Sequence, residues 1–235
     1  MTKRSAVLRA DSPGGGMPRC FSNPRLHWAL SVAALIVLAL LMTEYHRWRG
    51  RPWEVFSFNK GLAIAATALL AWACTLGPLY RLGMVGPRLL RSRRPVAVVG
   101  SLGVGLHILL VFTFLWDRFG WSWVVENPVS AALGGLAALG LGAMAVTSWP
   151  WAPRRLGMSA WLRMHSPARW ILVAAAAHYI ALGKPANWVA WARTFDQPVP
   201  PGTTVPTAMI LIVVVVAGIA RRHDSRVSKK PADAD

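Results

Sequence analysis

Six runs of apolar residues limit what this chain of 235 residues can fold into. They cover residues 27–43, 61–80, 96–116, 129–149, 168–183 and 204–220. Each run is about 16–21 residues long, close to the ~20 that a helix needs to cross the ~30 Å hydrocarbon core of a bilayer. No segment alternates as a membrane β-strand does. We therefore predict an all-α integral membrane protein, a bundle of six helices.

The composition agrees with a membrane protein, because 54% of the residues are hydrophobic and only 15% are charged. The net charge of +17 raises the question of a nucleic-acid partner. The basic residues, however, are spread over several loops, where membrane topology and contact with anionic membrane lipids account for them. We therefore expect no nucleic-acid binding.

Basic residues also indicate the orientation, because cytoplasmic loops of membrane proteins are enriched in lysine and arginine. The segments 1–25, 81–95, 150–169 and 221–235 hold 19 of the 26 lysines and arginines. This distribution places both termini in the cytoplasm. It divides the chain into an N-terminal tail (1–25), a transmembrane domain (26–220) and a disordered C-terminal tail (221–235).

His107 and His178 lie deep within the third and fifth apolar runs, whereas lysine, arginine and acidic residues lie outside the runs or at their ends. An ionisable residue inside a membrane segment indicates a functional site. Neutral imidazole is the commonest metal ligand among side chains. The two histidines are therefore the first candidates for a binding site.

The spacing of the histidines predicts that these two reach the same depth. His107 follows Arg94 by 13 residues, and His178 follows His165 by 13 residues. Both steps correspond to a rise of ~20 Å along a helix. Because the third and fifth helices cross in the same direction, His107 and His178 can face each other. His165 is left near the cytoplasmic surface, level with Arg93 and Arg94.

Two imidazoles from facing helices form the kind of site that holds a cofactor in a bundle. No carboxylate or thiolate accompanies them, which disfavours zinc and di-iron centres, and the absence of a CxxCH motif excludes c-type heme. Heme iron needs only two axial nitrogens. We expect one heme between His107 and His178 and a second near His165. The alternatives are interhelical hydrogen bonds or a proton relay.

The 13-residue step from His165 to His178 has a geometric consequence. It turns a helix by about 140° away from the same face. The fifth helix must therefore tilt or bend, or the two hemes must lie at different angles. Pro167 restricts Ser166 and places His165 before or at the first turn of this helix.

Glycines accompany the candidate ligands. Gly100, Gly103 and Gly105 precede His107, and the fourth run also contains several glycines. Glycines allow close helix packing, which we favour for the fourth run. In the third run, room for a flat macrocycle is an equal alternative.

A set of motifs resembles a known family. These are Gly77-Pro78-Leu79, Arg93-Arg94, His107, Thr147-Ser148, Arg154-Arg155-Leu156-Gly157, Trp161, His165 and His178-Tyr179. They resemble the ferric reductase-like transmembrane domain family over about residues 55–185. The likeness is greatest to its short bacterial branch, the heme-binding membrane subunits of protein-methionine-sulfoxide reductase systems.

The resemblance implies b-type heme associated with His107, His165 and His178. It also implies electron transport across the bacterial inner membrane to a periplasmic molybdenum-cofactor reductase, which repairs oxidised methionines. Quinone, FMN or a cytoplasmic flavin reductase is the implied electron donor. Larger relatives carry a second histidine on the third helix, where this chain has the Arg93-Arg94 neighbourhood.

We call the region of the expected second heme, near His165, the inner level, and that of the heme between His107 and His178 the outer level. Arginines near the inner level are candidates for binding heme propionates, because guanidinium pairs well with carboxylate. The candidates are Arg93, Arg94, Arg154 and Arg155. For Arg154 and Arg155, a role in membrane topology is an equal alternative.

Two other functions remain open at this stage. One is a stand-alone membrane reductase of ferric or cupric ions. The other is a heme-free transporter with a proton relay, which the absence of membrane-embedded acidic residues disfavours. No nucleophile–base pair is evident, so we expect catalysis on a substrate to belong to a partner.

Overall fold

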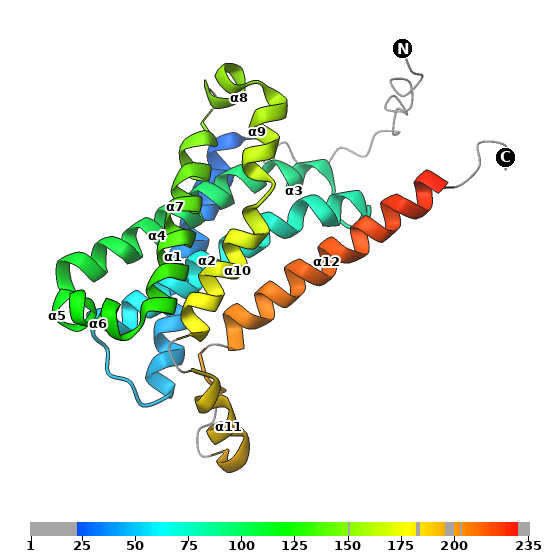
Figure 1. The fold of residues 1–235 in the computed structure, drawn as a ribbon. Coiled ribbons are helices and arrows are strands. Elements are labelled where there is room, and N and C mark those ends of the chain that lie inside the picture. The colour runs from blue at the N-terminus through cyan, green and yellow to red at the C-terminus, as the bar shows by residue number, and fades with distance from the viewer. Residues whose placement is uncertain (1–22, 150, 182–183, 196–199, 203, 230–235) are drawn as a thin grey trace.

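The structure is a computed structural model that describes residues 23–149, 151–181, 184–195, 200–202 and 204–229 (Figure 1). Its helices are α1 (Pro24–Trp48), α2 (Val55–Arg81), α3 (Pro87–Arg91), α4 (Arg93–Phe114), α5 (Trp116–Phe119), α6 (Trp121–Glu126), α7 (Pro128–Thr147), α8 (Trp151–Leu156), α9 (Met158–His165), α10 (Ala168–Ile180), α11 (Lys184–Thr194) and α12 (Thr204–Lys229). The described part of the chain contains no strand. The all-α prediction is confirmed for these residues.

Five helical segments among the described residues are long and apolar enough to cross a membrane. They are Pro24–Trp48, Val55–Arg81, Pro87–Phe114, Pro128–Thr147 and Thr204–Ser225. The remaining predicted span, 168–183, forms the 13-residue helix α10, which is only ~20 Å long. The predicted count of six spanning helices therefore stays a prediction. Pro167 explains the short helix, because proline interrupts regular helical hydrogen bonding and disfavours a helical conformation at Ser166.

The break before α10 separates the two histidines that the sequence places on one helix. His165 is the last residue of α9, and α10 begins at Ala168. The expectation that His165 precedes the first turn is confirmed. The helix is thus interrupted at Ser166 and Pro167, between the two histidines.

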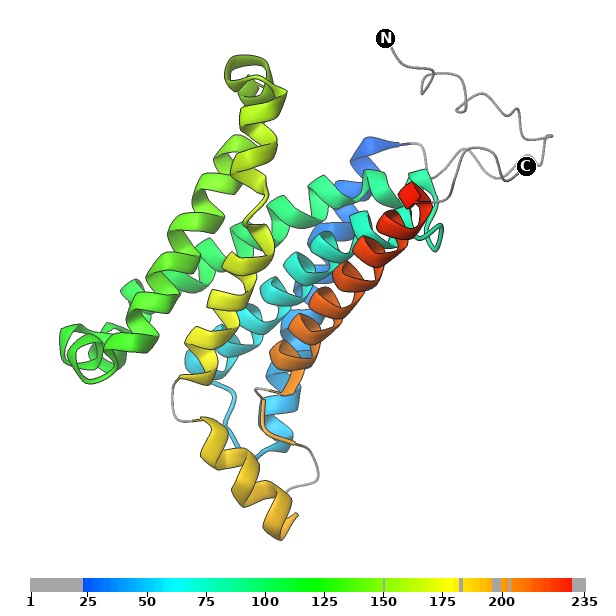
Figure 2. The same ribbon diagram turned by 45° about the vertical axis from the view of Figure 1, so that its right-hand side comes forward.

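The connecting segments gather at two ends of the bundle (Figure 2). One end contains α3, α8, the start of α1 and the end of α12, and we call it the basic end. The opposite end contains α5, α6 and α11. The basic end thus brings together described parts of the four arginine-rich segments. The predicted tails 1–25 and 221–235 lie partly outside the described residues.

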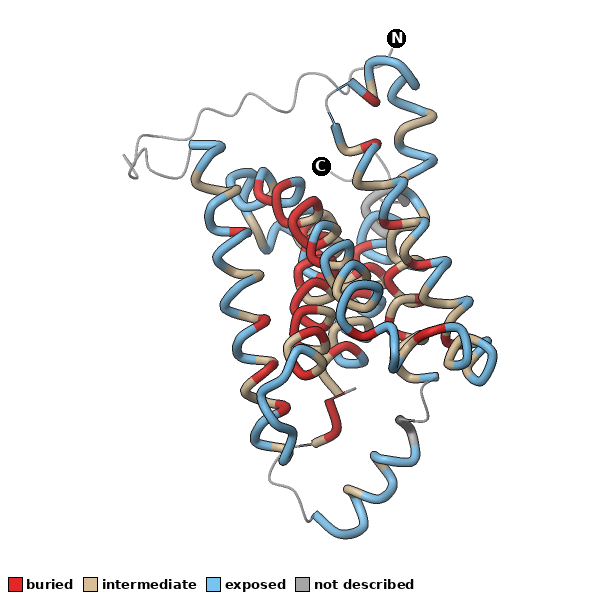
Figure 3. Tube along the Cα trace, turned by 90° about the vertical axis from the view of Figure 1, so that its left-hand side faces the viewer, coloured by how far each residue is buried: buried red, intermediate tan, exposed pale blue. Residues whose placement is uncertain are grey.

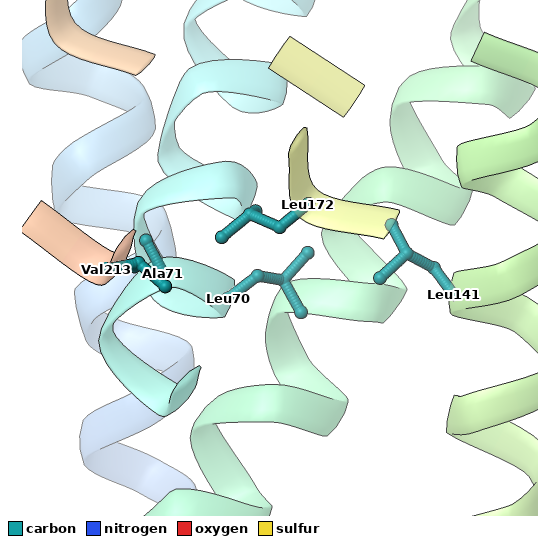
Figure 4. Close-up of a cluster of buried hydrophobic side chains, with 5 residues drawn as sticks. All are labelled: Leu70, Ala71, Leu141, Leu172 and Val213. Atoms are coloured by element: carbon teal, nitrogen blue, oxygen red, sulfur yellow. The ribbon is translucent and has the colours of Figure 1, made fainter. Parts of the chain in front are cut away.

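Helix α2 is the centre of the bundle (Figure 3). Of its most apolar 18-residue window, 56% is buried, against 17–28% for the other four candidate spans. Helices α1, α4, α10 and α12 pack around it. Figure 4 shows the cluster that joins α2 to α7, α10 and α12, namely Leu70, Ala71, Leu141, Leu172 and Val213. Side chains on α4 and α10 are therefore positioned against a common helix.

Two glycines of α4 serve close packing against α2. A Cβ atom on Gly100 would lie 3.0 Å from Leu70 Cγ and 3.2 Å from the Ala66 carbonyl oxygen. One on Gly103 would lie 3.0 Å from Ala66 Cβ. Small residues let membrane helices approach in this way. Gly105 has no such neighbour within 4 Å and is exposed.

The predicted disorder of the C-terminal tail is wrong for residues 221–229. Helix α12 continues without interruption to Lys229. Near its end, Arg81 Nη1 of α2 lies 3.0 Å from Asp224 Oδ2. This ion pair connects the end of α12 to the end of α2, a contact that charge composition alone does not reveal.

Candidate functional site

His107 is held by a polar partner on the central helix. Its Nδ1 atom lies 2.9 Å from Oδ1 of Asn59, which belongs to α2 and is buried. An amide oxygen only accepts hydrogen bonds, so the Nδ1–H of His107 donates to it. The Nε2 atom then keeps its lone pair. This is the arrangement in which a histidine oriented through one nitrogen binds a metal through the other.

His178 is held in the same way by a different helix. Its Nδ1 atom lies 2.7 Å from the carbonyl oxygen of Ser130 on α7, to which the Nδ1–H donates. The buried Ser130 hydroxyl lies 2.9 Å from the carbonyl oxygen of His178 and donates to it. This reciprocal pair fixes the ring, and the Nε2 atom again keeps its lone pair.

Gly134 of α7 provides the space for the His178 ring. A Cβ atom at Gly134 would lie 2.7 Å from His178 Nδ1 and 3.0 Å from its Cε1. These distances are shorter than ordinary van der Waals contact. The predicted packing role of a glycine in this segment is confirmed here, and the packed group is the candidate ligand itself.

The structure places His107 on α4 and His178 on α10. Their helices, α4 and α10, both pack against α2 and α7. Both histidines remain partly exposed. The common depth of the two histidines stays a prediction. The chemical result is two imidazoles on separate helices, each with an Nε2 lone pair.

His165 has a different environment. The Thr147 hydroxyl donates to the Ala143 carbonyl, with an oxygen–oxygen distance of 2.7 Å, and accepts from His165 Nε2 at 3.0 Å. Trp161 donates to the Thr147 carbonyl, and its ring lies 4.4 Å from the His165 ring between centroids. The nitrogen left free is Nδ1. Burial, reinforced by the charge of Arg93, lowers the pKa of His165 and favours its neutral form.

The four predicted arginines do not form one group. Arg93 is the neighbour of His165, and a Cβ atom on Gly77 would lie 3.5 Å from Arg93 Nη1. Arg94 instead lines a cavity against the start of α1. Arg154 and Arg155 are exposed on α8. The charge of Arg93 thus acts on His165, although the Arg93 side chain is exposed like those of Arg154 and Arg155.

Several residues of this site are not evident from the sequence. Asn59 lies just before the second apolar run and Ser130 near the start of the fourth, so both resemble ordinary boundary residues. Arg169 was assigned only to membrane topology, yet its Nε is buried and has no hydrogen-bond partner within the described residues. The sequence marks these residues only as polar residues at the edge of an apolar run. Many membrane helices share this feature, so it does not identify a site.

The donor set among the described residues consists of imidazoles. No three histidine, cysteine or acidic side chains come together there in a way that would hold a metal ion. A cofactor that brings its own equatorial ligands, and needs only axial nitrogens, fits this set.

Comparison with known proteins finds a relative that matches part of the chain. The chain is similar to the heme-binding subunit MsrQ of protein-methionine-sulfoxide reductase from Caulobacter vibrioides, with 34% identity over 102 residues. The match covers 42% of this chain and 48% of that protein, so the chain spans about half the length of this relative. No family model matches. The resemblance to heme-binding membrane subunits is thus supported over part of the chain.

Proposed function

We propose that this chain is the b-type cytochrome subunit of a membrane reductase complex. In this proposal it carries electrons across the bacterial inner membrane to a periplasmic molybdenum-cofactor reductase that repairs oxidised methionines. The main support for the proposal is that His107 Nε2 and His178 Nε2 each keep a lone pair that can bind iron. The partial similarity to a heme-binding subunit of a methionine-sulfoxide reductase supports it.

The residues of the outer level fit a heme. His107 and His178 would supply the two axial nitrogens, and a heme held there would provide a one-electron redox centre. Asn59 and Ser130 hold the protons at the two Nδ1 atoms and set the orientation of both rings. These hydrogen bonds also increase the electron density on the ligating nitrogens. Small shifts of either partner are therefore expected to change the redox potential.

The inner level offers a less complete set of ligands for a second heme. His165 would bind through Nδ1, because Thr147 engages its Nε2. Arg93 lies beside it, and the buried Nε of Arg169 is an unsatisfied donor at the same end of the bundle. Both guanidinium groups suit heme propionates. For Arg94, Arg154 and Arg155, binding of heme propionates stays a prediction. Arg94 lines a cavity at the basic end, and Arg154 and Arg155 are exposed.

The direction of electron flow follows from the proposed orientation. The donor, whether quinone, FMN or a cytoplasmic flavin reductase, would approach the basic end. The molybdenum-cofactor reductase would bind the end formed by α5, α6 and α11. In this proposal the chain conducts electrons and leaves the substrate chemistry to its partner.

The deciding experiment is a reduced-minus-oxidised absorption spectrum of the purified full chain, with quantification of heme per chain. The proposal predicts a b-type spectrum and at least one heme. A folded protein without heme, produced with ample heme supply, would refute the proposal and favour a proton relay. Fast reduction of ferric or cupric ions without any partner would favour a stand-alone metal reductase.

Replacing His165 with alanine is expected to spare the outer heme and to remove only a second one. The reason is that His165 belongs to α9, on the other side of the break at Pro167. Within the described residues it shares no hydrogen bond with His107 or His178. Heme content would fall to one per chain, with an unchanged contribution from the outer centre. Loss of all heme from a folded His165→Ala protein would contradict the assignment of two levels.

Asn59→Leu tests the partner that orients His107. The substitution keeps the number and branching of the side-chain heavy atoms but removes the oxygen that accepts from Nδ1, so the imidazole loses its fixed orientation. Loss of such a partner typically lowers metal affinity about 10–100-fold. Heme titration should show this loss together with a shifted midpoint potential. Thr67→Val on the same helix is the matched control, because the Thr67 hydroxyl bonds only within α2.

A further inference from the structure

A cavity of about 230 Å³ lies at the basic end, between the start of α1 and the junction of α3 and α4. It is lined by Pro24, His27, Trp28, Arg91, Arg94 and Pro95. One water molecule occupies ~30 Å³ in the liquid. The cavity is therefore large enough to admit a phosphate-sized group.

The inner wall of this cavity is well packed. Trp28 of α1 packs against a buried cluster that includes Val96 and Val99 of α4, and Pro95 is itself buried. These contacts fix the two helices against each other beneath the cavity. The helix pair thus forms the base of the cavity, and the exposed arginines form part of its rim.

The charge lining the cavity is positive. Arg91 and Arg94 are three residues apart and both are exposed. No acidic side chain lines the cavity, and the ion pairs recorded within the described ranges involve Arg47 and Arg81 instead. Guanidinium groups match phosphate oxygens geometrically, and the Trp28 indole and His27 imidazole can add hydrogen bonds.

The position of the cavity along the bundle indicates that the bound phosphate belongs to a lipid. Both α1 and α4 begin here, at Pro24 and Arg93, and both become apolar within a few residues. This is the boundary between water and hydrocarbon, where phospholipid phosphates lie. Further along, Leu30 of α1 and Leu102 of α4 are exposed, as a surface for acyl chains requires. Basic pockets between membrane helices on the cytoplasmic side are known to bind anionic head groups.

We propose that this cavity binds the phosphate of an anionic phospholipid, with Arg91 and Arg94 as its principal contacts. The site joins α1 to α4 and is separate from the histidine pair. It does not depend on the heme proposal, because the hydrogen-bond partners of His107 and His178 within the described residues, Asn59 and Ser130, do not line the cavity.

The test is native mass spectrometry of the delipidated full chain in detergent, titrated with phosphatidylglycerol, phosphatidylcholine or inorganic phosphate. The double variant R91Q/R94Q is expected to bind phosphatidylglycerol about 30-fold more weakly, since each arginine near anionic lipid contributes about fivefold. The control R88Q/R222Q removes two exposed arginines from the same end but leaves the cavity lining intact. It is expected to bind phosphatidylglycerol like the unchanged protein.

Thermal unfolding of both variants in detergent verifies that each is folded. Phosphatidylglycerol should raise the melting temperature of the control but not of R91Q/R94Q. Equal losses of affinity in the two double variants would overturn the proposal, because general charge would then explain binding. Equal affinity for phosphatidylcholine, or preferential binding of inorganic phosphate, would overturn the assignment to an anionic lipid.

Discussion

Alanine in place of His107 or His178 is expected to abolish binding of the outer heme. Each substitution removes one of the two Nε2 atoms available as axial ligands. Loss of a residue that merely orients a ligand already costs about 10–100-fold in metal affinity, so loss of the ligand itself should cost more. Heme quantification and the reduced-minus-oxidised spectrum of each purified variant measure the effect. If His165 holds a second heme, that centre should remain.

His223→Ala is the matched control for these variants, because His223 is an exposed histidine of α12. It should keep the heme content of the unchanged protein. Size-exclusion chromatography and circular dichroism show whether each variant is folded. Full heme content in both folded variants, His107→Ala and His178→Ala, would mean that the ligand assignment is wrong.

Gly134→Ala is expected to produce the second largest effect, although it adds only one methyl group. The new Cβ would lie 2.7 Å from His178 Nδ1, an atom that Ser130 holds by a 2.7 Å hydrogen bond. The ring cannot keep both this bond and its position. We therefore expect heme affinity to fall by about 10–100-fold, as for other losses of ligand orientation. Heme titration of the purified variant measures the change.

Gly135→Ala separates this local clash from the general effect of alanine in a helix. Gly135 is the next residue of α7, and a Cβ atom there has no neighbour within 4 Å. Both substitutions bring the same gain in helix propensity, about 1 kcal/mol. Only Gly134→Ala should lose heme. Similar heme binding by the two folded variants would show that His178 does not need its present position.

Local sequence properties predicted the secondary structure well. Long apolar runs form helices in a membrane because each helix satisfies its own backbone hydrogen bonds. The boundaries at Pro167 and at the start of α7 follow from proline and the apolar pattern. The extension of α12 beyond residue 220 was missed, because the ion pair between Arg81 and Asp224 joins residues that are distant in the sequence.

The resemblance motif acquires a physical meaning in the structure. Thr147, Trp161 and His165 are spread over 19 residues of sequence, yet they form one hydrogen-bonded and stacked group. Sequence spacing could not reveal which nitrogen of His165 is engaged. It also treated Arg93 and Arg94 as one pair, whereas in the structure Arg93 lies beside Gly77 of α2 and Arg94 lines the cavity against α1. Adjacent helical residues point about 100° apart, which accounts for this separation.

By itself, the sequence determined that the chain forms apolar helices and retains two histidines deep within them, because hydrophobicity and helical rise are local quantities. Only the tertiary structure decided which imidazole nitrogens are free to bind. That choice depends on Asn59 and Ser130, each 48 residues away from its histidine. A hydrogen bond between distant residues exists only after helix packing has placed donor and acceptor together.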